Sequence, residues 1–231
     1  MKKWKIKRIN RIRLRRKRKI SRGQHVSWTS IKTNKSKSNW SNVYRYKPNI
    51  SKSVYKNSFF RNVRIRSGNM TRSNFNNSCF IDVDFIFVNL SNSKFYDAKF
   101  VNCMFFGCNF NQTSFKNASF QHTVFISCNF KNIKDFRLGQ NSRVVKKMSI
   151  DQISHSLEQA VLAMKNNKTL EQYHILTSVS NGVNKWLLAI LLEKYTEDDL
   201  TKFFNKIERT NKVRFYSFSQ YKKSLDKFYK R

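Results

Sequence analysis

The residue types best suited to chemistry in this sequence are the lysines and arginines that crowd its first 22 residues. Thirteen of these residues are basic, and Trp4 and several isoleucine and leucine residues lie between them. Because like charges at this density repel one another, we expect the segment to be extended when free. Against a phosphate backbone the same charges release counterions and gain affinity, and Trp4 can stack on an unpaired base. The predicted nucleic-acid-binding residues of this segment are Lys2, Lys3, Trp4, Lys5, Lys7, Arg8, Arg11, Arg13, Arg15, Arg16, Lys17, Arg18, Lys19 and Arg22.

The chain as a whole is also strongly basic. Its 231 residues include 47 Lys and Arg against 13 Asp and Glu, which gives a formal net charge of +34. No acid precedes Asp82, whereas 24 bases do. A charge of this size favours a polyanionic partner: RNA, DNA or an anionic membrane. We favour RNA over DNA because a polycationic tail is most useful between closely packed RNA helices.

No segment of the sequence is suited to crossing a membrane. The longest strongly apolar run, WLLAILL at 186–192, has 7 residues, and a membrane-spanning helix needs about 20. The apolar residues of the basic start have only partial helical order, which disfavours a membrane-surface helix. An organellar transit peptide is a further alternative for this start, although RIRLRRKRK is denser in charge than such peptides. The sequence therefore indicates an intracellular protein of the cytoplasm or an organellar matrix, the mitochondrion included.

The acidic residues do not form a recognisable catalytic or metal site. Asp82 and Asp84 are expected on an outer surface, where they bond turns and aid solubility. The run Glu197, Asp198 and Asp199 is expected to begin a helix, because the helix dipole favours acids there. Nucleotide-binding and hydrolase motifs are absent, and so is the paired-cysteine spacing of a zinc site. We therefore expect a protein that is not an enzyme and has no metal or cofactor.

A strict period of five runs through the middle of the chain. Large apolar residues recur at every fifth position, and a small residue lies two positions before each of them. Neither a helix nor an ordinary strand has this period. The large series is Tyr55, Phe60, Ile65, Met70, Phe75, Phe80, Phe85, Leu90, Phe95, Phe100, Phe105, Phe110, Phe115, Phe120, Phe125 and Phe130.

This pattern resembles the pentapeptide-repeat family over residues about 53–134. The resemblance implies a right-handed quadrilateral β-helix of about four coils, in which each pentapeptide forms one side. Both the large and the small residue of each repeat would point inward. Phe60, Phe80, Phe100 and Phe120 would then share one column of stacked rings, because one coil takes 20 residues. Backbone groups would pair between neighbouring coils as they do between strands.

The same alignment places the cysteines. Cys103, Cys108 and Cys128 occupy the small inward position, and Cys79 is expected to face outward. Cys108 and Cys128 are 20 residues apart and should stack in adjacent coils, where a disulfide is an alternative. We favour reduced core cysteines.

The flanks of the repeat differ from it in composition. Residues 1–52 form a basic N-terminal arm, and residues 140–231 change to a helical period. Capping boxes at Ser149 and Thr169 and an N-cap at Thr196 are expected to begin helices. The C-terminal region as a whole is predicted to be a bundle of about four helices. The predicted fold is therefore a β-solenoid with an extended basic arm and a C-terminal helical bundle.

These features predict a non-enzymatic nucleic-acid-binding structural protein. RNA within a large ribonucleoprotein such as a ribosome, with protein partners in the assembly, is the favoured setting. Arginines of the first predicted coil are expected to continue the basic track of the arm along the rod. These additional candidate nucleic-acid-binding residues are Arg61, Arg64, Arg66 and Arg72.

The alternative prediction is a protein-interaction adaptor that uses the wall of the β-helix. It depends on apolar side chains at outward positions, because exposed apolar patches usually mark partners. These are Phe59, Ile81, Ile86, Phe87, Met104, Phe106, Val124 and Ile126.

Mimicry of DNA is a further activity to weigh, because some pentapeptide-repeat proteins resemble DNA in shape and acidity and bind gyrase. Residues 57–134 contain 9 bases and only 3 acids. A rod of that charge cannot imitate a polyphosphate, so the sequence disfavours this activity.

Overall fold

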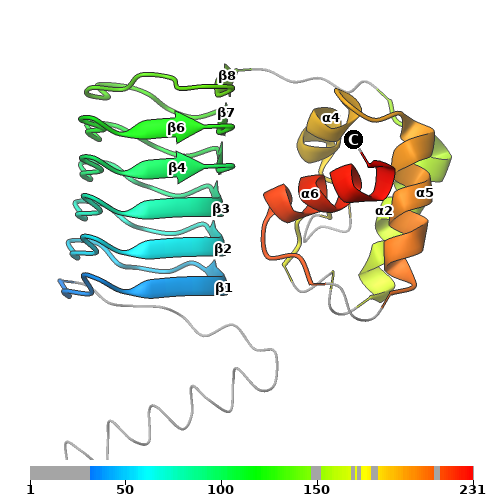
Figure 1. The fold of residues 1–231 in the computed structure, drawn as a ribbon, viewed down its shortest axis with the longest axis horizontal. Helices are drawn as coiled ribbons and strands as arrows, with labels where there is room; N and C mark the ends of the chain where they lie inside the picture. The colour runs from blue at the N-terminus through cyan, green and yellow to red at the C-terminus, as the bar shows by residue number, and fades with distance from the viewer. Residues whose placement is uncertain are drawn as a thin grey trace, which may run out of the picture.

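The computed structural model describes residues 32–146, 152–167, 170, 173–177, 182–210 and 214–230. They form a stacked parallel β-solenoid with a group of helices beside it (Figure 1). The arm residues from Lys2 to Arg22 lie outside the described residues, as do the expected caps at Ser149 and Thr169.

The solenoid has about five turns, one more than the sequence predicted. Its strands pair in parallel with a register of 20 residues, so that Phe60 is opposite Phe80. The strands are β1 (Asn39–Tyr46), β2 (Phe59–Arg66), β3 (Cys79–Ile86), β4 (Lys99–Val101), β5 (Met104–Phe106), β6 (Ser119–Gln121), β7 (Val124–Ile126) and β8 (Arg143–Val145).

The additional turn lies upstream of residue 53, where the sequence had placed the basic arm. Strand β1 pairs with β2 along its length, and Asn34 already bridges to Val54. Trp40 stacks on Phe60 with ring centroids 6.4 Å apart and planes 8° apart. The repeat is concealed in the sequence because a basic residue, Arg45, stands at a fifth position that is apolar in later coils.

The predicted columns of aromatic rings form the core of the solenoid. Phe60 stacks on Phe80 at 4.7 Å, Phe80 on Phe100 at 4.8 Å, and Phe100 on Phe120 at 4.9 Å. These four rings are at most 1 % exposed. Such pairs contribute roughly 0.5–1.5 kcal/mol each beyond the burial of their area. The columns therefore both fill the tube and fix the coil-to-coil register.

The small inward residues do more than permit close approach of the walls. Their side chains donate hydrogen bonds to carbonyl oxygens of the preceding coil, such as Ser78 Oγ to Tyr55 O at 2.7 Å. Cys108 Sγ makes the equivalent contact with Phe85 O at 3.2 Å. All four cysteines are free in the structure; Cys103 and Cys108 are buried, and Cys79 is half-buried. Serine, threonine and cysteine are thus interchangeable here as small donors.

The C-terminal region contains four α-helices among the described residues. They are α2 (His155–Ala163), α4 (Lys185–Leu192), α5 (Glu197–Glu208) and α6 (Phe218–Tyr229), and the 3-10 turn η1 (Met164–Asn166) follows α2. Helix α5 begins after the predicted N-cap Thr196, which also forms a capping box with Asp199. Helix α2 begins at His155, later than predicted, and the Ser154 side chain accepts a hydrogen bond from the N–H of Leu157.

One wall of the solenoid packs against these helices, and we call it the bundle-facing wall. It consists of the outward residues at positions 44, 46, 64, 66, 84, 86, 104, 106, 124 and 126. Ile86, Met104, Phe106 and Ile126 belong to the same hydrophobic cluster as the buried residues of the helices, and each is at most 8 % exposed. The helices therefore cover most of the apolar wall that the adaptor prediction required.

Candidate nucleic-acid interface

Arg64 does not point into solvent as the sequence predicted. It is 2 % exposed, and its Nη1 lies 2.7 Å from Asp84 Oδ2. Its Nη2 donates to the carbonyl of His174 at 3.0 Å. The residue stands on the bundle-facing wall, so the helices remove it from solvent. Arg64 is therefore a structural residue and is withdrawn from the set of candidate nucleic-acid ligands.

Asp82 and Asp84 also differ from the prediction, since both are buried where the solenoid meets α6. Asp84 accepts a hydrogen bond from the backbone N–H of Phe218 at 2.8 Å. Asp82 accepts one from Ser219 Oγ at 2.5 Å and pairs with Lys223 Nζ at 2.6 Å. Burial raises the pKa of Asp84 to about 6, and the Arg64 charge opposes that rise. These two acids attach the start of α6 to the solenoid.

The other three predicted arginines lie on different sides of the solenoid. Arg61 is exposed beside the bundle-facing wall, and Arg66 is half-buried on that wall. Arg72 is exposed at a corner with a φ of 55°. The sequence placed all four arginines on one track, but positions five or six residues apart fall on successive walls of a four-sided coil. The structure therefore does not bring these arginines together.

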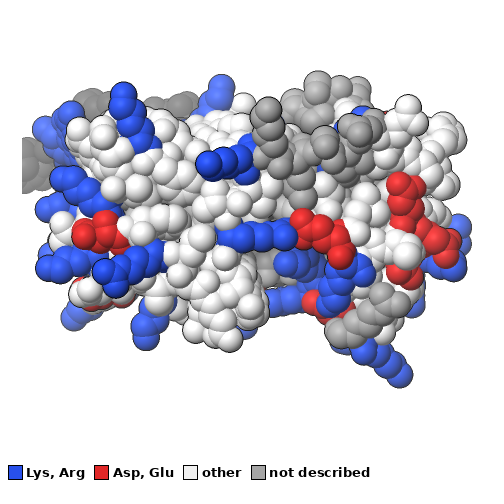
Figure 2. Space-filling model, turned by 90° about the horizontal axis from the view of Figure 1, so that it is seen from above, with Lys and Arg blue, Asp and Glu red and all other residues white. Residues whose placement is uncertain are grey.

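Arg72 and six lysines gather on the wall opposite the bundle and at its corner, two pentapeptides away around the coil. Figure 2 shows Lys and Arg crowding the end of the molecule that is remote from the helices. All of the group are exposed, and Asp97 and Asp135 are the acids on the same side. We call this group the far face; it consists of Lys32, Lys52, Lys56, Arg72, Lys94, Lys116 and Lys134.

The solenoid fixes the spacing of these charges. Lys52 N–H bonds to Thr71 O and Lys32 N–H bonds to Ser51 O, so Lys32, Lys52 and Arg72 occupy one corner of three successive coils. Neighbouring coils are separated by about 4.8 Å, the spacing of paired strands. A regular row of cations on a rigid wall can contact several phosphates without ordering its backbone at the time of binding. This geometry suits a polyanion better than a small ligand.

The far face also carries one aromatic ring. Tyr96 is half-buried on this wall, and the Nζ of Lys94 lies 5.9 Å from its ring centroid. Tyr96 and the far-face lysines do not stand out in the sequence, because their common wall becomes visible only when the chain is folded in steps of 20 residues. The 20-residue register is the signal that would have found them.

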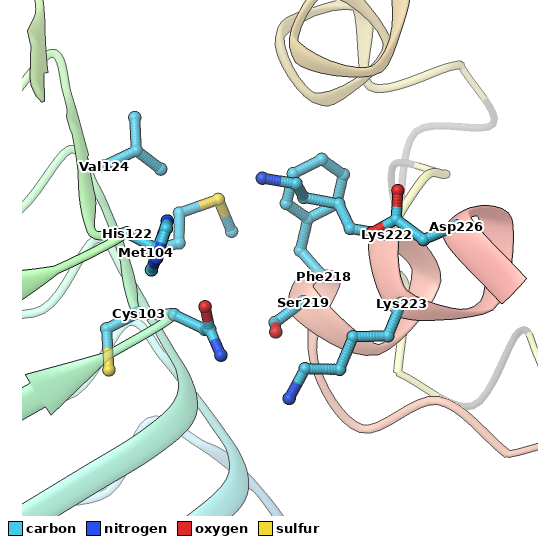
Figure 3. A pocket seen from close by; sticks show the side chains of 10 residues that line it. Cys103, Met104, His122, Val124, Phe218, Ser219, Lys222, Lys223 and Asp226 are labelled. Carbon is cyan, nitrogen blue, oxygen red and sulfur yellow. The ribbon is translucent and has the colours of Figure 1, made fainter. Parts of the chain in front are cut away.

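A cavity of about 180 Å³ lies between the solenoid and α6 (Figure 3). Met104 and His122 line its solenoid side, and Lys222, Lys223 and Asp226 line its helix side. The charges in it are largely compensated, since Lys223 pairs with Asp82 and Asp226 pairs with Lys194. We therefore interpret the cavity as a gap in the packing between the solenoid and α6 and not as a ligand site.

Metal and membrane features are absent from the part of the chain that the structure describes. In that part, no cluster of three or more His, Cys, Asp or Glu is arranged to hold a metal ion. No helix within the described ranges has the length and apolarity needed to cross a membrane.

Comparison with known proteins concerns the solenoid. Residues 69–105 and 103–134 match the family model of pentapeptide repeats, in eight copies. No curated protein matches the sequence.

Solved structures similar to this chain include three pentapeptide repeat proteins. Rfr23 from the cyanobacterium Cyanothece 51142 is 10% identical, with 51% of this chain and 88% of that one covered and a TM-score of 0.29. A protein from the Arabidopsis thaliana thylakoid lumen is 14% identical, with coverage of 44% and 68% and a TM-score of 0.29. HetL from Nostoc sp. strain PCC 7120, which is involved in heterocyst differentiation regulation, is 8% identical, with coverage of 53% and 89% and a TM-score of 0.16. At these identities the likeness concerns the fold alone.

Proposed function

The solenoid belongs to the pentapeptide-repeat family, and we propose that it is a rigid, non-enzymatic rod that holds a nucleic acid along the far face. The observation that carries this proposal is the group of exposed bases on the wall opposite the bundle, three of which stand in successive coils. Folding alone gives no reason to gather like charges there, since they repel one another. A polyphosphate on that wall would relieve the repulsion and release its own counterions.

The basic N-terminal arm supports the same partner. It precedes the first coil, whose corner carries Lys32, and so it can continue the basic surface of the far face along a polyanion. We favour RNA within a large ribonucleoprotein, because an arm this basic suits the dense phosphate between RNA helices. In that assembly the helical bundle closes one side of the rod and leaves the far face for RNA.

The adaptor alternative loses most of the apolar surface on which it depended. Ile86, Met104, Phe106 and Ile126 are buried against the helices of the same chain. Mimicry of DNA is opposed by the exposed charges of the far face, which have the wrong sign.

Fluorescence anisotropy with a labelled RNA, measured over a series of salt concentrations, tests the proposal. We expect the logarithm of the affinity to fall linearly with the logarithm of the salt concentration. The variant Lys56→Gln/Lys94→Gln/Lys116→Gln should bind more weakly and lower the salt slope by about 1 for each phosphate that a lysine no longer neutralises.

The matched control is Lys185→Gln/Lys206→Gln/Lys227→Gln, which removes the same charge from exposed helix positions. It should change the affinity and the slope much less. Equal losses in the two variants would show that only net charge matters, and would contradict a site on the far face. Absence of RNA binding by the full chain would refute the proposed function altogether.

A further inference from the structure

Phe87 stands at a corner of the solenoid where an aromatic side chain is poorly suited. Its φ is 50°, and its side chain is 53 % exposed. Left-handed backbone conformation favours glycine and asparagine and is unfavourable for bulky residues. Among the described residues with positive φ, Phe87 is the only one with an apolar side chain. Neither core packing nor corner geometry explains a phenylalanine here.

The next coil leaves space for the Phe87 ring at Gly107. A Cβ added to Gly107 would lie 2.4 Å from Phe87 Cδ1, so only glycine leaves room for the ring. On one side the ring contacts Phe106, with centroids 5.1 Å apart. Phe106 in turn contacts Trp186 of α4 at 5.7 Å. One side of the Phe87 ring is thus held in place, and more than half of the side chain remains open to solvent.

A second exposed aromatic residue lies at the same edge, two coils away. Tyr46 is 36 % exposed, and the register joins it to Arg66 and then to Ile86, the neighbour of Phe87. Two coils correspond to roughly 10 Å. The guanidinium of Arg66 lies 5.9 Å and the Nζ of Lys47 lies 5.3 Å from the Tyr46 ring centroid. We call Tyr46, Lys47, Arg66 and Phe87 the corner patch.

The surroundings of the corner patch carry no negative charge, which favours an anionic partner. The adjoining wall presents asparagine at the same position in five successive coils, and none of its outward positions carries an acid. That column is Asn49, Asn69, Asn89, Asn109 and Asn129. Two exposed rings with two cations beside one of them, on a side without acids, fit a chain of phosphates with unpaired bases. A duplex keeps its bases stacked inside and would leave the two rings without partners.

We propose that the corner patch binds single-stranded nucleic acid, with bases stacked on Phe87 and Tyr46 and phosphates on Lys47 and Arg66. This inference rests on the proposed function and names its ligand more closely. The far face and the arm recognise phosphates of any strand, whereas the corner patch adds a preference for unpaired bases.

The experiment compares two probes on the full chain by fluorescence anisotropy: a labelled uridine 12-mer and a blunt-ended RNA duplex. Stacking contributes about 1–3 kcal/mol per base, so Phe87→Asn should weaken binding of the 12-mer about 5-fold to 150-fold. The affinity for the duplex should stay within about twofold. Asparagine also suits a corner with positive φ, so the melting temperature should be unchanged or higher. Tyr46→Leu should weaken binding of the 12-mer in the same way, and Leu138→Asn is the control at a similarly exposed apolar residue (48 %).

Several results would overturn the inference while leaving the proposed function intact. Equal affinity of Phe87→Asn and the wild-type protein for the 12-mer would show that no base stacks on Phe87. If Phe87→Asn lowered the melting temperature and lowered the affinity for both probes equally, the role of Phe87 would be structural. It would then shield the contact between the solenoid and α4 beside Trp186. Tighter binding of a polyglutamate peptide than of the 12-mer, abolished in Phe87→Asn, would assign the corner patch to a protein. Failure of the wild-type chain to bind either RNA would instead refute the proposed function.

Discussion

Removing one partner of the buried Arg64–Asp84 ion pair should destabilise the protein far more than removing both. The two side chains are 2 % and 0 % exposed and 2.7 Å apart. Breaking a buried pair leaves an uncompensated charge and costs about 3–5 kcal/mol. Each partner keeps one other bond, Arg64 to the carbonyl of His174 and Asp84 to the N–H of Phe218. We therefore expect about 3 kcal/mol for Asp84→Asn and for Arg64→Met, the lower end of that range.

The double variant Arg64→Met/Asp84→Leu should be more stable than either single variant. It removes both charges, and Arg64 Nε and Asp84 Oδ1 have no hydrogen-bond partner among the described residues. The double variant also loses the bond from Arg64 to the carbonyl of His174 and the bond from the N–H of Phe218 to Asp84. At roughly 0.5–1.5 kcal/mol each, these two hydrogen bonds cost about 1–3 kcal/mol together. Replacing a buried ion pair with apolar residues of similar volume is often neutral or better. The expected coupling between the two sites is therefore at least about 2 kcal/mol.

Urea unfolding followed by circular dichroism and by tryptophan fluorescence measures these differences. Because the pair joins the solenoid to α6, the single variants should also separate the two signals into distinct transitions. The control is Lys202→Ala, which breaks an exposed pair with Asp198 on α5 and should leave the unfolding curve unchanged. The reasoning would be refuted if the single variants had a free energy of unfolding within about 1 kcal/mol of wild type. It would also be refuted if the double variant lost as much stability as the two single variants added together.

Three further predictions concern the carboxyl group of Asp84 and two residues of the solenoid core, Phe100 and Ser78. The pKa of Asp84 in the folded state is about 6, above its ordinary value of 3.8. The folded state therefore binds the carboxyl proton of Asp84 more tightly than the unfolded state does. As a result, Asp84 adds stability as the pH falls from about 7 to 4. Melting temperature measured against pH should show this gain relative to the variant without the ion pair, and parallel curves would contradict it. Phe100→Ala should cost about 3–5 kcal/mol by urea unfolding, because it opens a cavity between two stacked rings; a loss below about 1 kcal/mol would show that the column collapses around it. Ser78→Ala should cost about 1–3 kcal/mol because Tyr55 O loses its donor, whereas Ser78→Cys should retain most of the stability; equal losses would contradict the role of this position as a donor.

The solenoid was predictable because its rule is local. A large residue every fifth position and a small one two before it fix the coil, the columns and the inward cysteines. The first turn was missed because Arg45 breaks the rule at the end of the stack, where an inward residue is only half-buried and the penalty for a charge is reduced. The cap of α5 at Thr196 was also local, and it was predicted correctly.

The surfaces were not predictable in the same way. Asp82, Asp84 and Arg64 were predicted to face solvent. The outward apolar residues marked a wall that is covered, but they did not show that helices of the same chain cover it. That packing depends on contacts between residues more than 100 positions apart, such as Asp84 with Phe218. The far face was missed for a related reason, because Lys56, Lys94 and Lys116 are scattered in sequence and become neighbours only through the 20-residue register.

The measurement that tests the central claim most directly is the size of the particle that contains this protein in its native source. An extract prepared at low salt would be divided and treated with RNase, with DNase or with neither, and each portion would be sized by gradient sedimentation. We predict that RNase moves the protein from a large particle to a small one and that DNase does not. A large particle that withstands both nucleases would contradict nucleic-acid binding as the function of the far face and the arm.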